Sequence, residues 1–233
     1  MISKDSTKKI LVKLKIMAES VSSSSTRKLV RIDISSDNLC PWCYVGKINL
    51  DKAIAASKHQ FDFEIHWHPY FLEPCAPKEG VNKRDFYRKK FGSRYEQIIR
   101  HTTEAYKSLG LNYNMDGLTG NTVDSHRLIY FAGKQGLDKQ HDLVEELFCG
   151  YMTQGKYIGD WEFLLECAKK VGVEGAAEFL QDPNNGLKEV NDDFEKYSAH
   201  LGGVPYYVIN GKHKFSGGLP PEGFLRAFEG ASK

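Results

Sequence analysis

The 233-residue sequence predicts an α/β protein whose mixed sheet is interrupted by a large helical insertion. Two alternating, β-branched segments flank a helical segment near the start, a long run of helical periodicity follows, and a strand-turn-strand pattern precedes a last helix. Because strands stand on both sides of the helical run, that run must leave and rejoin one sheet. We expect an extension at 1–28, the first half of the sheet domain at 29–76, the insertion at 77–191 and the second half at 192–233.

Composition indicates a soluble globular protein. Hydrophobic residues make up 41% and charged residues 27% of the chain, and the formal net charge is only +2. Scattered Lys and Arg at this balance predict no nucleic-acid partner. No stretch approaches eighteen apolar residues, so no membrane partner is expected. Five cysteines at mixed spacings argue against a disulfide framework and favour a reducing compartment, with the cytoplasm preferred.

The N-terminal extension, residues 1–28, is basic and ends in a serine-rich run, which predicts disorder. A transit peptide is the alternative, but the segment carries Lys more than Arg and includes two acids. Lys13 and Lys15 also interrupt its apolar stretch, which disfavours a secretory signal. A cytoplasmic location is therefore expected, with organelle targeting left open.

The opening unit reads as strand, helix, strand. Leu29–Ser35 alternates apolar and polar residues, and Phe61–Trp67 does so again. Between them, helical spacing begins after Pro41 and runs to about Ser57.

The insertion, from about Pro77 to Asn191, reads as five or six short helices punctuated by glycines. Ser93–Glu96 fits a capping box, and Asn121–Asp124 places a capping Asn before an acid. The chain then returns to strand character at Val204–Ile209. Asn210-Gly211 predicts a hairpin turn, residues 212–216 pair back, and a helix begins at Pro220-Pro221 and ends near Gly230.

The segment Cys40-Pro-Trp-Cys43 carries the clearest chemistry. Proline is favoured at the first helical position, so Pro41 places Cys40 at the N-cap, where free backbone N–H groups and the helix dipole stabilise a thiolate. Cys43 lies three residues on, on the same helix face and within reach of a disulfide. We expect Cys40 to be the nucleophile and Cys43 the resolving thiol.

Metal binding is the competing interpretation of this pair. A structural zinc site needs two further Cys or His ligands at short spacing, and Cys75, Cys149 and Cys167 stand singly. We therefore expect no metal. The three single cysteines are expected to be ordinary small apolar side chains.

Val204-Pro205 opens a strand that otherwise reads as central. Proline is poorly tolerated inside a sheet, so a cis peptide bond is one explanation and an edge strand with a trans proline is the other.

Taken together, these segments resemble DsbA-like thioredoxin-fold proteins, and most closely the FrnE branch of that family. The matching segments are 36–47, 121–128, Gly159-Asp160, 203–211 and 215–218. The resemblance implies a thioredoxin-like sheet with an inserted helical domain, dithiol–disulfide chemistry without a cofactor, and a cis-Pro205 beside the cysteine pair. It also implies that Val204 pairs with the substrate backbone, so that Pro41, Trp42, Val204 and Pro205 contact substrate.

His126 belongs to one of the matching segments and is the auxiliary candidate, although a helix-capping or domain-docking role is favoured over catalysis. Protein or small-molecule thiols and disulfides are the expected substrates, with glutathione as a co-substrate or a thioredoxin-type protein as the reductant. Two other functions stay open. One is a glutathione-dependent transferase or isomerase, like the kappa-class transferases and 2-hydroxychromene-2-carboxylate isomerases that share this fold. The other is a non-enzymatic metal-binding or interaction module.

Overall fold

The computed structural model describes residues 27–231 and begins with the predicted strand-helix-strand unit. Strand β1 (Lys28–Ser36), helix α2 (Pro41–Ser57) and strand β2 (Phe61–Pro69) follow one another. Most of the extension predicted to be disordered, residues 1–26, lies outside the described residues. Its last residue, Lys28, already belongs to β1, so folded structure starts one residue earlier than expected.

The main sheet has four strands in the order β2-β1-β5-β6. β1 runs parallel to β2 and antiparallel to β5 (Tyr206–Ile209), which pairs with β6 (His213–Ser216). The predicted hairpin turn has positive φ at both Asn210 and Gly211, the conformation that suits a two-residue turn between twisted strands. The last strand pair is shorter than predicted, because β5 starts at Tyr206 rather than at Val204.

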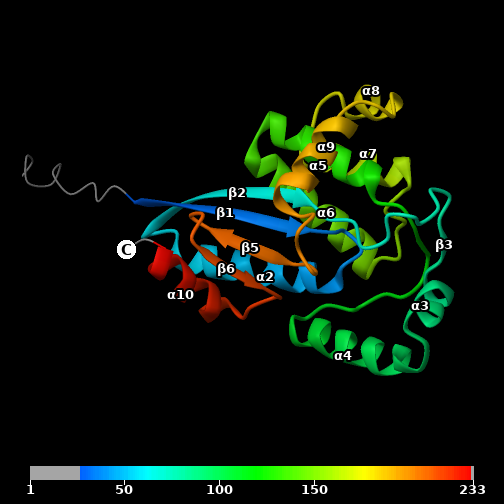
Figure 1. The fold of residues 1–233 in the computed structure, drawn as a ribbon, viewed down its shortest axis with the longest axis horizontal. Helices are drawn as coiled ribbons and strands as arrows, with labels where there is room; N and C mark the ends of the chain where they lie inside the picture. The colour runs from blue at the N-terminus through cyan, green and yellow to red at the C-terminus, as the bar shows by residue number, and fades with distance from the viewer. Residues whose placement is uncertain (1–26, 232–233) are drawn as a thin grey trace, which may run out of the picture.

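Strand alternation gives the sheet one apolar and one polar face. Val30, Ile32 and Ile34 of β1 are fully buried on the side where α2 and α10 (Pro221–Ala231) pack. Burying each such side chain stabilises the fold by about 1.5–3 kcal/mol. The opposite face carries charged and imidazole side chains and is covered by α9 (Leu187–Tyr197). Figure 1 shows the β1 arrow pointing toward the helical block.

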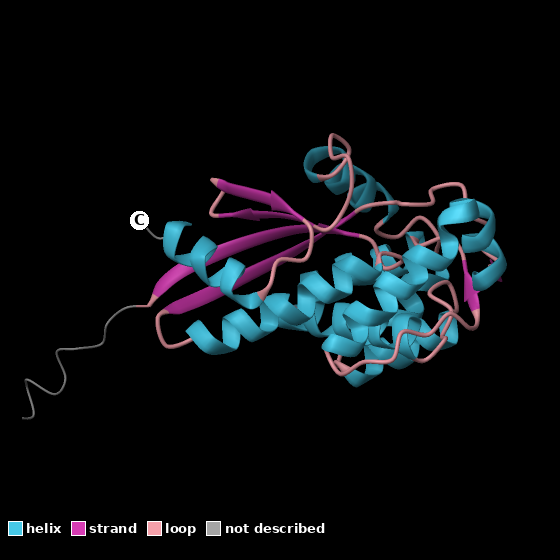
Figure 2. Ribbon diagram, turned by 90° about the horizontal axis from the view of Figure 1, so that it is seen from below, coloured by secondary structure: helices cyan, strands magenta, loops and turns pink. Residues whose placement is uncertain are grey.

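Within the described residues, the segment between β2 and β5 forms seven α-helices rather than the predicted five or six. Figure 2 shows them gathered at one end of the sheet. Two elements were not expected: the 3-10 helix Gly92–Arg94 and a small ribbon of β3 (Val81–Asn82) and β4 (Leu118–Thr119). The helices before α9 are α3 (Lys83–Phe91), α4 (Tyr95–Ser108), α5 (Val123–Gln135), α6 (Leu137–Thr153), α7 (Trp161–Lys170) and α8 (Ala176–Gln181).

Two sequence predictions within this block need correction. Ser93 is no helix cap: it lies in the 3-10 helix, and the backbone continues helically through Arg94 into α4, so no extended N-cap residue exists there. The end predicted for the insertion, residue 191, falls inside α9, which continues to Tyr197. Asn121 lies one residue before the N-cap of α5, Thr122, and its side-chain oxygen accepts a hydrogen bond from the Val123 N–H (2.9 Å).

Lys83, at the start of α3, is buried inside this block. Its ammonium donates hydrogen bonds to the carbonyl oxygens of Asn114 (3.0 Å) and Tyr151 (2.9 Å) and lies 3.8 Å from the Tyr151 ring centroid. Burial lowers the pKa of Lys83 from 10.5 to about 7.

The Lys83 pKa predicts a stability that increases with pH. Between about pH 7 and pH 10.5 the unfolded chain binds the lysine proton and the folded chain releases it, so the free energy of unfolding rises with pH. In urea denaturation, wild type should gain about 2 kcal/mol more than Lys83→Met between pH 7 and pH 9. Equal gains in the two proteins would contradict the prediction.

Candidate active site

The start of α2 places the first cysteine as the sequence predicts. Cys40 is the N-cap residue, with extended backbone (φ −87°, ψ 110°), and Pro41 occupies the first turn. The Cys40 side chain makes no capping hydrogen bond, and the Cys40 N–H donates to the Asp37 carbonyl (2.9 Å). The residue that carries this sulfur therefore lies at the N-terminus of α2, which is the positive end of the helix dipole.

Cys43 lies behind Cys40 and has no exposed surface, while Cys40 is 5% exposed. Both are free thiols. Burial raises the pKa of the Cys43 thiol well above its ordinary value, and the adjoining Cys40 sulfur raises it further. The Ser36 hydroxyl and the Asp37 backbone N–H oppose that rise. The pair therefore combines a largely buried Cys40, which keeps a small exposed surface, with a fully buried Cys43 whose thiol ionises less readily than an ordinary one.

The segment before β5 closes over Cys40. The Val204–Pro205 peptide bond is cis, and the Cys40 Sγ–H donates to the Val204 carbonyl oxygen (3.5 Å). A groove of about 680 Å³ begins here, walled by Trp42, by residues 200–206 and by residues 216–218. The structure therefore brings the predicted residues of the two motifs, 40–43 and 204–205, to one place.

Helix α4 adds residues that the sequence gave no reason to expect. The His101 ring centroid lies 5.0 Å from a ring centroid of Trp42, and the Tyr106 hydroxyl donates to the Pro41 carbonyl (3.0 Å). More than fifty residues separate α4 from the cysteines, and neither His101 nor Tyr106 belongs to a recognisable motif. Their place at the site becomes apparent only in the folded structure, where α4 packs against α2.

His126 contacts the surroundings of the active-site turn. It is 4% exposed, its Nε2 lies 3.1 Å from the Tyr70 carbonyl oxygen and 3.7 Å from a carboxylate oxygen of Asp37, and its ring packs edge-on against Phe71. The Asp37 carboxylate in turn accepts hydrogen bonds from the backbone N–H groups of Leu39 and Leu72. These contacts join α5 to the turn before Cys40.

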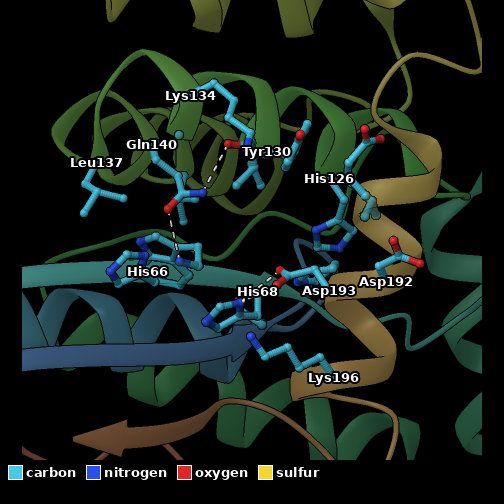
Figure 3. Close-up of a pocket in the computed structure, with 18 of the residues that line it drawn as sticks. His66, His68, His126, Tyr130, Lys134, Leu137, Gln140, Asp192, Asp193 and Lys196 are labelled. Carbon is cyan, nitrogen blue, oxygen red and sulfur yellow. Dashed lines mark hydrogen bonds and ion pairs between the residues drawn. The ribbon is translucent and has the colours of Figure 1, made fainter. Parts of the chain in front are cut away.

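A second cavity, of about 480 Å³, lies at the carboxyl ends of β1 and β2, under α5, α6 and α9. Figure 3 shows His66 and His68 on its β2 side, His126 and Tyr130 on α5, and Asp193 reaching from α9 toward His68. Ser36 and Asn38, which precede the cysteine pair, also line it. The cavity thus adjoins the buried side of the active site.

The three remaining cysteines do not join the pair. Cys167 is buried, Cys149 is partly exposed, and Cys75 is exposed in the loop after β2. Residues 27–231 contain no cluster of three or more His, Cys, Asp or Glu side chains suited to hold a metal ion. No helix in the same range is long and apolar enough to cross a membrane.

Residues 31–229 match the model of the DsbA-like thioredoxin domain. The chain belongs to the DsbA-like thioredoxin family. A solved structure of a probable DsbA oxidoreductase from Streptomyces coelicolor is 30% identical to it, with a TM-score of 0.76 over 87% of this chain and 89% of that one. The uncharacterized protein YwbO of Bacillus subtilis (strain 168) is 26% identical over 77% of this chain and 86% of its own length.

More distant members of the fold share its architecture. The cytosolic disulfide reductase DsbM from Pseudomonas aeruginosa is 17% identical, with a TM-score of 0.54 over 86% of this chain and 97% of that one. Membership of the DsbA-like family accounts for the sheet and the inserted helices. The FrnE branch stays a prediction.

Proposed function

We propose that the protein is a thiol-disulfide oxidoreductase in which Cys40 is the nucleophile and Cys43 the resolving thiol. The observation that carries the proposal is the placement of Cys40: its sulfur lies at the N-terminus of α2, 3.5 Å from the Val204 carbonyl, with Cys43 buried behind it. Membership of the DsbA-like family supports this chemistry.

The reaction follows from this placement. The Cys40 thiolate attacks one sulfur of a substrate disulfide, a mixed disulfide forms and the first substrate thiolate leaves. Cys43 then loses its proton and attacks the Cys40 sulfur, which forms the 40–43 bond and releases the second substrate thiolate. The substrate gains two electrons and the cysteine pair loses two. The reverse sequence oxidises a substrate dithiol.

The groove beside Val204 and Pro205 suggests how substrate is held. Its walls include Gly202, Gly203 and Trp42, which suit an extended peptide or a small thiol such as glutathione. We propose that Trp42 and Pro205 contact the groups flanking the reacting sulfur, and that Pro41 and Val204 contribute through their backbone. A thioredoxin-type protein or glutathione would reset the pair.

The test is catalysis of the reduction of a protein disulfide by dithiothreitol. Wild type should accelerate the reaction, and Cys40→Ser should reduce it to the uncatalysed rate. Cys75→Ser is the matched control, because that thiol is exposed but lies outside the site, and it should keep wild-type activity. If wild type gives no acceleration, or if Cys40→Ser retains it, the proposal fails.

A further inference from the structure

The hydroxyl of Tyr207 is buried without a hydrogen-bond partner. Among residues 27–231 it is the one buried side-chain polar atom of which this is true. A buried hydroxyl without a partner destabilises a fold, so a group left in this state calls for an explanation. The Tyr207 ring is fixed by Phe215, which stacks on it, and by Phe224, which packs edge-on, so the hydroxyl has a defined position.

That position is one helical turn from Cys43. A Cβ added to Gly46 would fall on the Tyr207 hydroxyl oxygen, so the missing side chain at 46 provides the space that the hydroxyl occupies. Gly46 follows Cys43 by three residues, a spacing that places two positions on the same face of a helix, with Cβ atoms about 5–6 Å apart. The hydroxyl therefore lies against the face of α2 that carries the resolving sulfur.

The other groups around these two side chains are few. Cys40, the Ser36 hydroxyl and the Asp37 N–H adjoin the Cys43 sulfur, and Cys43, Cys40 and Asp51 are the titratable groups that act on Tyr207. Burial raises the pKa of the Tyr207 phenol, and these neighbours raise it further, so the hydroxyl keeps its proton and can donate it in a hydrogen bond.

We propose that the Tyr207 hydroxyl is a hydrogen-bond donor for the Cys43 thiolate during the resolving step. The inference rests on the proposed function. In that step Cys43 becomes an anion in a buried site, where a hydrogen bond from a free O–H stabilises the negative charge more than it would in water. The hydroxyl has no partner in the dithiol state, where it destabilises the fold, and it acquires one when Cys43 ionises. The new hydrogen bond stabilises the Cys43 thiolate and so increases the rate of the resolving step.

Dithiobis(nitrobenzoate) separates the two steps, because each releases one coloured thiolate. Cys40 attack breaks the reagent disulfide and releases the first thiolate, and Cys43 attack on the mixed disulfide releases the second. The protein is used with Cys75 and Cys149 replaced by serine, so that the two accessible single thiols do not react. In this background, Tyr207→Phe should leave the first phase unchanged and slow the second about three- to tenfold. The midpoint of the pH profile of the second phase should move to higher pH.

The stability of the variants distinguishes this role from a structural one. Tyr207→Phe should unfold at the same temperature as wild type or higher, because it removes an unpaired hydroxyl. Tyr87→Phe is the matched control: its buried hydroxyl pairs with that of Tyr151 (3.5 Å), so it should lose stability and keep both phases. A second phase at the wild-type rate in Tyr207→Phe, or an equal slowing of both phases, overturns the inference.

A measurement on the native tyrosine tests the inference even if the Tyr207→Phe variant does not fold. The Cys40→Ser protein is labelled with carbon-13 at the tyrosine carbon that bears the hydroxyl, and its NMR spectrum is followed as the pH is raised. The Tyr207 resonance should move as Cys43 deprotonates. A resonance that stays fixed through that titration overturns the inference. Failure of the proposed function itself looks different, because wild type would then release no second thiolate at all.

Discussion

Replacing Cys43 by serine is expected to stop turnover and to leave the substrate covalently attached to Cys40. Cys43 has no exposed surface, and the Ser36 hydroxyl and Asp37 N–H already surround its sulfur, so a serine hydroxyl fits the site with little change in packing. Cys40 retains its place at the N-cap and still attacks a disulfide. Without the second thiol, the mixed disulfide has no internal route to break down.

Mass spectrometry under non-reducing conditions measures this adduct. With Cys75 and Cys149 also replaced by serine, the Cys43→Ser protein should gain the mass of one substrate thiol, and dithiothreitol should remove it. Cys167→Ser is the matched control, because it replaces another fully buried cysteine away from the site and should keep turnover. Continued turnover of Cys43→Ser or Cys43→Ala with glutathione and a small electrophile would contradict the resolving role and favour a transferase or isomerase.

Replacing His68 by alanine is expected to lower the free energy of unfolding by about 3–5 kcal/mol near pH 6. His68 is 7% exposed on the polar face of the sheet, with Nε2 3.0 Å from Asp33 and Nδ1 2.9 Å from Asp193. Its ring stacks on Tyr197 with centroids 3.7 Å apart. The imidazolium therefore joins β1 and β2 to α9, and its removal leaves two carboxylates without their shared cation.

The contribution of His68 depends on pH in a defined direction. Burial lowers the pKa of His68, but hydrogen bonds to Asp193 and Asp33 raise it by more, so the net pKa lies above 6.5. Burial raises the pKa of Asp33, yet hydrogen bonds from His68 and Arg31 lower it to well below 3.8. The His68 contribution is complete below pH 6.5 and is lost as the pH rises through the folded pKa, whereas that of Asp33 is complete above pH 3.8 and is lost toward acid.

Urea denaturation at several pH values tests both statements. The stability difference between wild type and His68→Ala should be largest between about pH 4 and pH 6.5 and should shrink at alkaline pH. His66→Ala is the matched control, because that half-buried imidazole forms its ion pair with Glu64 on its own strand and its removal should cost less than about 1 kcal/mol. A difference that does not vary with pH would mean that His68 acts through packing alone.

The features that the sequence predicts correctly are those determined by a few neighbouring residues, such as helix starts, strands and turns. Pro41 identifies the start of α2, alternation identifies β1 and β2, and Asn210-Gly211 identifies the hairpin turn, because each of these signals acts within a few residues. The predicted number of helices in the block was too low, because a short helix gives little local signal. Glycines punctuate the block, but the six-residue α8 is too short to show a helical period.

The remaining features of the site depend on tertiary contacts. His101 and Tyr106 become part of the site only when α4 docks on α2. Tyr207 reads as one more alternating residue of a strand, and Gly46 as an ordinary helix glycine. Their relation appears only when β5 packs under α2, because periodicity assigns a residue to a face and not to a partner on another element.

The helical block is attached to the sheet at two neighbouring points. Pro69, the last residue of β2, pairs with Ser36, and Tyr206, the first residue of β5, pairs with Ser35 on the other side of β1. The two ends of the 136 residues from 70 to 205 are therefore only about two strand spacings apart, roughly 10 Å. Loop closure entropy grows slowly with length, so extra residues in the loops of this block would add little closure cost. The loops can thus vary in length while Cys40 and Cys43 keep their place at the start of α2.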